Sequence, residues 1–306
     1  MLKMKRQLVS AFFAICCLLV QAASAQTEIT LKKTFIEKFK NRVTIDANFS
    51  VKHSLKKPHK PASDADIHCA GVAPEIGLAT VVELMNAASK PQIVQALVDA
   101  EGGSPVAISG VWRLWSEHGG ESFHVQGGSL PPIEDTNPDH VFEIHPITKV
   151  NGESMLDTIS SIQGYKPKDA LEAFTHYERT RCHLTPKAKT VTISTTMVGF
   201  NYVEFVMHLN EDPHPVADGT QVFAAVSEVD EDEEVIVRKR RMVFIQGTDE
   251  EAKVKLLHKG DSLHVLGIPR INLSLISWRI ANAKKKPQVL DWSLPYEIVI
   301  VGVLQD

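Results

Sequence analysis

Residues 136–146 read TNPDHVFEIHP, a stretch that places two carboxylates and two imidazoles within seven positions: Asp139, His140, Glu143 and His145. Apolar side chains alternate with these polar ones, which predicts a half-buried strand rather than a helix. Carboxylates and imidazoles near the end of a strand can bind a metal ion or transfer protons. They are also ordinary side chains on the solvent-facing side of a barrel strand. The stretch therefore indicates a fold more directly than a reaction.

The residues that precede this strand predict the rest of a barrel. Alternating patterns predict strands at 42–52, 64–72 and 106–117, and apolar residues at helical spacing predict a helix at 75–89. A second short helix is expected from Pro91, because proline favours the first helical position. The order strand, strand, helix, strand, strand is that of a five-stranded Greek-key barrel of the OB type.

Residues 42–150 resemble an OB-fold domain in their element order and in their closing strand. The EIHP run at 143–146 is similar to a run in the last strand of small secreted bacterial proteins with no assigned chemistry. The resemblance implies the fold and no particular activity.

The second half of the chain predicts another barrel. Residues 166–181 have a helical apolar stripe, and from Lys189 onward the pattern is again that of strands separated by turn residues. The segment 259–271, KGDSLHVLGIPRI, looks like the middle strand of an OB-type barrel. A faint repeat supports a duplication, since Asn-Arg-Val at 41–43 and Asn-Tyr-Val at 201–203 open similar strands. Ile147 and Ile268, each beside a proline, are a second expected match.

We therefore predict a mainly β protein with helices, built from two tandem OB-like five-stranded barrels joined by a helical linker. The expected divisions are a signal peptide at 1–25, an N-terminal domain at 26–155, a linker at 156–186 and a C-terminal domain at 187–306.

The first residues predict export. A charged start, an apolar run from Leu8 to Val20 and the small residues Ala23-Ser24-Ala25 form a cleavable signal peptide. The apolar run is too short for a spanning helix, and no later stretch reaches membrane length. We expect a periplasmic or extracellular protein, cleaved near Ala25, with no membrane span.

The charge balance disfavours nucleic acid as a partner. The chain has a formal net charge of −4, and cleavage would remove three basic residues and no acidic one, which makes it −7. Non-specific binding to nucleic acid needs positive charge at the phosphates, so only a local basic patch would permit it. The partners expected are an extended ligand or an envelope protein.

Two cysteines follow the signal peptide, Cys69 and Cys182. An oxidising compartment would allow them to form a disulfide that ties the two halves together. Buried free thiols are the alternative, since spacing alone does not bring two Cα atoms into bridging range.

Histidines are dense in the first predicted barrel. Of the 13 in the chain, seven lie there: His53, His59, His68, His118, His124, His140 and His145. Period-two geometry puts Asp66 and His68 on one side of their strand, and Glu143 and His145 on one side of theirs. If the two strands approach each other, these four residues would suit a divalent metal such as zinc, with Glu143 and His145 as catalytic groups. The plain alternative is a set of polar rim residues or a buried structural histidine, with no cofactor.

Two further groups are candidate ligand contacts. Trp112 and Trp115 fall on opposite faces of the strand VWRLW with Arg113 between them, so one indole is expected in the core and the other on a stacking surface. Arg238 and Arg240 share one face of a strand and form a basic strip for a ligand phosphate. The plain reading of this strip is a solvated hairpin neutralised by the acidic run before it.

No nucleophile elbow, glycine-rich phosphate loop or zinc-finger spacing is present in the sequence. The leading hypothesis is a secreted non-enzymatic binding module for an oligosaccharide, nucleic acid or peptide. The first alternative is a metal-dependent hydrolase such as a nuclease or phosphodiesterase, and the second is an envelope interaction protein. Whether the chain is an enzyme stays open at this level.

Overall fold

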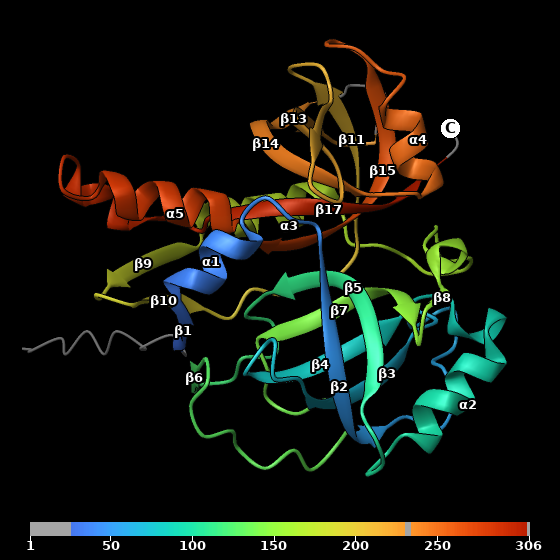
Figure 1. The fold of residues 1–306 in the computed structure, drawn as a ribbon. Helices are drawn as coiled ribbons and strands as arrows, with labels where there is room; N and C mark the ends of the chain where they lie inside the picture. Colours follow the sequence, from blue (N-terminus) through green and yellow to red (C-terminus); the bar gives the residue numbers. More distant parts are fainter. Residues whose placement is uncertain (1–25, 230–233, 305–306) are drawn as a thin grey trace, which may run out of the picture.

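In the computed structural model, residues 26–229 and 234–304 are described; the expected signal peptide lies outside them. The protein is mainly β, with two closed five-stranded barrels, a separate five-stranded sheet and short helices (Figure 1). None of the helices in the described ranges is long and apolar enough to cross a membrane. The predicted tandem OB-like architecture is confirmed.

The first barrel has the strand order of an OB fold. Its strands are β2 (Thr44–Ser54), β3 (Ile67–Val72), β4 (Ala79–Leu84), β5 (Val106–Leu114) and β7 (Phe142–Val150). β2 pairs with both β3 and β5, and β5 pairs with β7. The ring closes because β4 pairs antiparallel with β3 and parallel with β7. The helix α2 (Pro91–Asp99) lies between the third and fourth strands, and β8 (Glu153–Ser154) extends β7.

The predicted helix at 75–89 is wrong. Its centre is the strand β4, followed by the 3-10 turn η1 (Ala87–Ser89), and every residue of β4 is buried. Val82 and Leu84 on one face of β4 lie in the main core, and Glu83 on the other face meets His145. A strand buried on both faces has a continuous apolar run rather than an alternating one, and such a run also fits a helical stripe. The second expected helix, from Pro91, is confirmed as α2.

The second barrel repeats the same topology. Its strands are β11 (Val203–Leu209), β13 (Gly219–Ser227), β14 (Val235–Ile245), β15 (Ser262–Ile271) and β17 (Tyr296–Val303). β11 pairs with β13 and β15, and β14 pairs parallel with β17, as β4 pairs with β7. The helix α4 (Asp249–Val254) occupies the place of α2, and β12 (His214–Val216) is added beside β13.

The third sheet was not predicted. Its order is β16-β9-β10-β1-β6, formed by β16 (Asp291–Ser293), β9 (Arg181–Pro186), β10 (Thr190–Thr196), β1 (Gln26–Lys32) and β6 (Phe123–Val125). The remaining helical elements are α1 (Lys33–Phe39), η2 (Leu156–Thr158), α3 (Ala170–Arg179), α5 (Leu273–Asn282) and η3 (Pro287–Leu290). The helix α3 confirms the helix expected at 166–181. α5 extends past the barrels on the side of this sheet (Figure 1).

Matching residues prove that the two barrels are equivalent. Gly110 in β5 lies so close to Ile144 that an added Cβ would overlap its Cγ2 methyl, and Gly267 in β15 has the same relation to Ile298. GVWRL at 110–114 therefore corresponds to GIPRI at 267–271, and FEI at 142–144 to YEI at 296–298. The expected match of Ile147 with Ile268 is wrong, because these two residues lie in different strands of the repeat.

The barrels pack against each other through a reciprocal contact. In each barrel an arginine stands opposite a glutamate, as Arg113 does with Glu143 and Arg270 with Glu297. Arg113 Nε donates to the carbonyl of Pro269 (3.0 Å), and Arg270 Nη1 donates to the carbonyl of Trp112 (3.0 Å). Each arginine thus binds the residue just before the other arginine, as across a two-fold axis. A separate apolar core fills the space between the barrels.

Candidate functional site

A cluster of ionisable side chains lies between the barrels, on the outer face of the first one. Tyr202, from the start of the second barrel, donates its hydroxyl to Asp66 Oδ2 (2.8 Å) and accepts from His145 Nε2 (2.8 Å). The other ring nitrogen of His145, Nδ1, is 3.0 Å from Glu83 Oε2 and 3.5 Å from Glu143 Oε2. Asp66 and His145 are 0% exposed and Glu83 is 5% exposed, so the cluster is buried.

Glu143 connects this cluster to a second group of charges. Arg113 Nη1 donates to Glu143 Oε2 (2.6 Å), and Arg113 Nη2 reaches Glu117 (3.1 Å). His140 Nε2 lies 3.3 Å from the other oxygen of Glu143. His140 in turn stacks on His118, which is only half-buried. Glu143 is therefore neutralised by its own arginine and is less available to a ligand than Asp66 or Glu83.

Burial and neighbouring charges move the pKa values in this cluster. Burial raises the pKa of Asp66 to about 6, although its contact with His145 opposes the shift. Burial alone would lower the pKa of His145, but the charge of Glu83 and the contacts with Asp66 and Glu143 raise it to about 10. Burial would raise the pKa of Glu143, and Arg113 holds it well below its usual range. At neutral pH the cluster therefore contains an imidazolium among carboxylates.

The second barrel shows that an OB barrel does not need these charges. Ile144 corresponds to Ile298, and the parallel registers of β4 with β7 and of β14 with β17 then align Glu83 with Val243 and His145 with Val299. Both valines are buried in the apolar core between the barrels. A polar pair thus occupies in one repeat the place that an apolar pair fills in the other. Fold stability alone does not account for Glu83 and His145.

A second cluster lies beside the first at the surface. His59 Nδ1 is 2.8 Å from Asp64 Oδ1, and the ring of His59 stands edge-on to His68. All three side chains are partly exposed, and one ligand atom from each lies within 4.8 Å of the others. His68 Nε2 is 3.9 Å from Glu83 Oε1, so this surface group adjoins the buried one.

The predicted metal set of Asp66, His68, Glu143 and His145 is brought together only in part. Asp66, just before β3, and Glu143 in β7 both contact His145, although β4 separates these two strands in the sheet. His68 points instead to the surface group. Glu83 was missed, because its segment read as a helix and a lone glutamate in an apolar run gives no sign of a partner.

The predicted stacking surface on VWRLW is wrong, since both indoles are buried. Trp112 is 0% exposed, donates its Nε1 proton to the carbonyl of Arg42 and lies under the guanidinium of Arg270. Trp115 is 2% exposed and packs edge-on against Tyr177. Arg113 is buried with its carboxylates. The outer face of β5 packs against β15 of the second barrel, and residues 110–114 are buried, whereas Ala107 near the start of the strand is exposed.

The predicted basic strip is also divided. Arg238 is exposed, whereas Arg240 lies over the ring of Tyr296 and forms an ion pair with Glu178.

The predicted disulfide is wrong as well. Cys69 in β3 and Cys182 in β9 are buried free thiols in different sheets, and burial raises their pKa values to about 11 and about 12.

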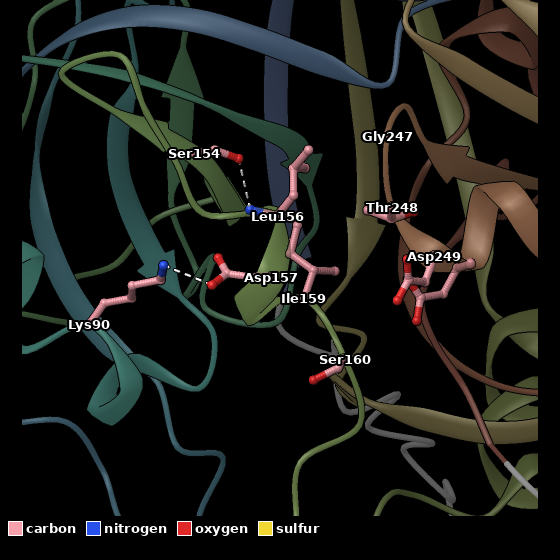
Figure 2. Close-up of a pocket in the computed structure, with 10 residues that line it drawn as sticks. Lys90, Ser154, Leu156, Asp157, Ile159, Ser160, Gly247, Thr248 and Asp249 are labelled. Atoms are coloured by element: carbon pink, nitrogen blue, oxygen red, sulfur yellow. Dashed lines mark hydrogen bonds and ion pairs between the residues drawn. The ribbon is translucent and has the colours of Figure 1, made fainter.

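A cleft of about 540 Å³ lies between the barrels on another side (Figure 2). Lys90 and Asp157, which form an ion pair at 2.8 Å, line one wall. Thr248 and Asp249 at the start of α4 line the other wall (Figure 2). Its one lysine is already paired, and none of the residues predicted from the sequence lies in it.

Exposed lysine and tryptophan side chains lie on α5, on β16 and on the segment between them. We call this region the α5–β16 surface; its side chains are Trp278, Arg279, Lys284, Lys285, Lys286 and Trp292. The two indoles are 47% and 48% exposed, and the three lysines are exposed. The segment 273–293 has four basic residues and one acidic residue, in a chain whose net charge is −4. The sequence analysis predicted a stacking surface at Trp112 or Trp115 instead. The run WRIANAKKK at 278–286, which joins a tryptophan to four basic residues, was a sequence signal for this surface.

Arg279 is the unusual member of this surface. It is 3% exposed, and its Nε and Nη1 have no hydrogen-bond partner in the described part of the chain. Its guanidinium carbon lies 5.8 Å from the centre of the Trp292 ring. Burial lowers its pKa. An unpaired buried cation is costly, so Arg279 requires an explanation beyond packing.

Comparison with known proteins adds little. No protein-family model and no curated protein matches the sequence. Among solved structures, the single-stranded DNA binding protein from Thermus aquaticus has a TM-score of 0.22 and 11% identity, covering 86% of this chain and 91% of that one. A deletion mutant of it gives the same TM-score and identity and covers 86% and 94%. A TM-score this low carries no argument, and the fold assignment stands on the strand pairing.

Proposed function

We propose that this chain is a non-enzymatic binding module whose α5–β16 surface holds an extended anionic ligand. Single-stranded nucleic acid is the ligand class that its chemistry matches. The observation that carries the proposal is Arg279, a buried guanidinium with unpaired Nε and Nη1 beside a half-exposed indole. A phosphate oxygen would accept from such a donor with a strong, charge-assisted hydrogen bond once the side chains that cover Arg279, which is 3% exposed, move aside.

The exposed indoles favour a strand with planar rings. Trp278 and Trp292 each leave about half of the side chain in water, 47% and 48% respectively. Stacking of a base on an aromatic ring contributes about 1–3 kcal/mol per base and tolerates any sequence. Three consecutive exposed lysines, Lys284 to Lys286, supply the positive charge that follows a phosphate backbone.

The hydrolase alternative is not supported by this geometry. Glu143 and His145, the expected catalytic pair, are 3% and 0% exposed and are covered by the second barrel. A general base must come within hydrogen-bond reach of the group it activates. A substrate would have to separate the two barrels, and break their reciprocal arginine contacts, before it reached either side chain.

Fluorescence titration with a single-stranded oligothymidylate at several salt concentrations tests the proposal. We expect quenching, because the two indoles that face solvent are those of the α5–β16 surface. Four phosphate contacts, from Arg279 and the three lysines, predict a slope of log K against log salt of about −3, at about −0.7 per contact. Replacing Lys284, Lys285 and Lys286 by glutamate should remove binding.

A matched control variant distinguishes the effect of charge at the α5–β16 surface on binding from the effect of the net charge of the protein. Lys56, Lys57 and Lys60 are exposed lysines of the first barrel, and their replacement by glutamate changes the net charge by the same amount. This variant should bind as the native protein does. Loss of binding in the control would move the ligand to the first barrel. Binding of a neutral oligosaccharide, with no salt dependence, would overturn the nucleic-acid assignment.

A further inference from the structure

Three polar atoms in the buried cluster lack hydrogen-bond partners. They are Asp66 Oδ1, Glu83 Oε2 and His145 Nδ1, on side chains that are 0%, 5% and 0% exposed. Glu83 Oε2 and His145 Nδ1 face each other as an ion pair at 3.0 Å without a hydrogen bond, and Asp66 Oδ1 has neither. Nearly all buried polar atoms in proteins are hydrogen-bonded, so this cluster requires an explanation. An ion shared by all three would satisfy them together.

The arrangement of these atoms suits a common ligand. One ligand atom from each residue lies within 4.8 Å of the other two, and His145 Nδ1 is 3.0 Å from Glu83 Oε2. Tyr202 fixes the opposite side of the imidazole, since its hydroxyl contacts His145 Nε2 and donates to Asp66 Oδ2. Metal-bound histidines are oriented in this way, with one nitrogen on the metal and the other hydrogen-bonded.

The charges also fit a divalent cation. Zinc would replace the Nδ1 proton of the His145 imidazolium, which would pass to solvent. The carboxylates of Asp66 and Glu83 would then balance its two positive charges, because Glu143 is already neutralised by Arg113. Imidazole together with carboxylate oxygens is a donor set that zinc accepts. The second barrel, with Val243 and Val299 at the positions of Glu83 and His145, has no such donor set.

We propose that Asp66, Glu83 and His145 bind one divalent transition-metal ion, with Zn²⁺ as the probe, in a site that stabilises the contact between the barrels. The site is independent of the α5–β16 surface. His59, Asp64 and His68 form the entrance, because His68 Nε2 lies 3.9 Å from Glu83 Oε1 and all three side chains of this entrance group reach solvent.

Zinc analysis and thermal unfolding of the full chain test this site. We expect about one zinc per chain after dialysis against Zn²⁺, and removal by EDTA. Zinc at about 100 times its Kd should raise Tm by about 5–10 °C. Replacing both Glu83 and His145 by valine copies the second barrel, so this variant should fold, bind no zinc and show no shift. Glu83→Gln, which keeps the side-chain shape, is a second variant if the double valine fails to fold.

Variants of the entrance group test whether the zinc binds there instead of at the buried site. Replacement of His59 and His68 by alanine should slow zinc uptake and leave one zinc bound at equilibrium. Absence of zinc binding by the native chain, or retention of zinc by a folded valine or glutamine variant, would overturn the proposal. Loss of zinc from the His59/His68 variant would also overturn it, because the ion would then belong to the surface group.

Discussion

Replacing Arg279 by methionine should make the free protein more stable and its ligand binding weaker. Arg279 is 3% exposed, and two of its nitrogens have no partner in the described residues. Methionine has a similar length and carries no charge. The substitution therefore removes a desolvated cation and keeps most of the packing against Trp292.

The expected magnitude follows from two opposing effects. Replacing buried charges by apolar groups of similar volume stabilises proteins by about 1–4 kcal/mol. The cation–π contact that is lost has a guanidinium-to-ring distance of 5.8 Å, near the outer limit, and contributes about 0.5–1 kcal/mol. The net gain is about 0–3.5 kcal/mol, which raises Tm by up to roughly 14 °C. Loss of a hydrogen bond to a charged group, about 1.5–3 kcal/mol, should weaken oligonucleotide binding by about 10–150-fold.

Urea denaturation and fluorescence titration of the same preparations measure both effects. Arg270→Met is the matched control, because Arg270 is 1% exposed and is paired with Glu297 at 2.8 Å. Breaking that pair should destabilise the protein by about 3–5 kcal/mol. If Arg279→Met destabilised the protein by more than about 1 kcal/mol, Arg279 would have a structural role and the anion site would be refuted.

Three further predictions concern strand packing, the charge of His145 and the two thiols. Gly267→Ala should destabilise the protein by about 1–3 kcal/mol in urea denaturation, because the added Cβ would overlap the facing strand. Gly103→Ala is the control and should have almost no effect, because its added Cβ would have no neighbour closer than 3.5 Å. The pKa of His145 is about 10 in the native state, above the ordinary value of about 6.5. Between about pH 6.5 and about pH 10 the native state therefore binds a proton that the unfolded chain has lost. The free energy of unfolding in EDTA should therefore fall as pH rises from about 7 to 10, and a flat profile would contradict the imidazolium. Cys69 and Cys182 should react with Ellman's reagent only after unfolding, and both should then be counted as free thiols. A count of fewer than two would support the disulfide hypothesis.

The sequence predicted the elements whose signal is local. Alternation in β2, β5 and β7 marks strands that have a core face inside the barrel and a different environment outside. The pattern at β4 failed for a related reason: both of its faces are buried, so alternation disappears. The third sheet escaped prediction because its strands come from residues 26–32, 123–125, 181–196 and 291–293, and no local pattern records which distant strands pair.

The amino-acid sequence by itself determined the tandem barrels and the chemical character of the strand ending in His145, since both depend on side-chain order along one segment. Only the tertiary structure decided which side chains share an environment. It placed Glu83 against His145, buried Trp112 and Trp115, and left Arg279 with unpaired nitrogens beside Trp292. The physical reason is that burial and pairing are set by the packing of one barrel against the other, which joins residues far apart in the chain.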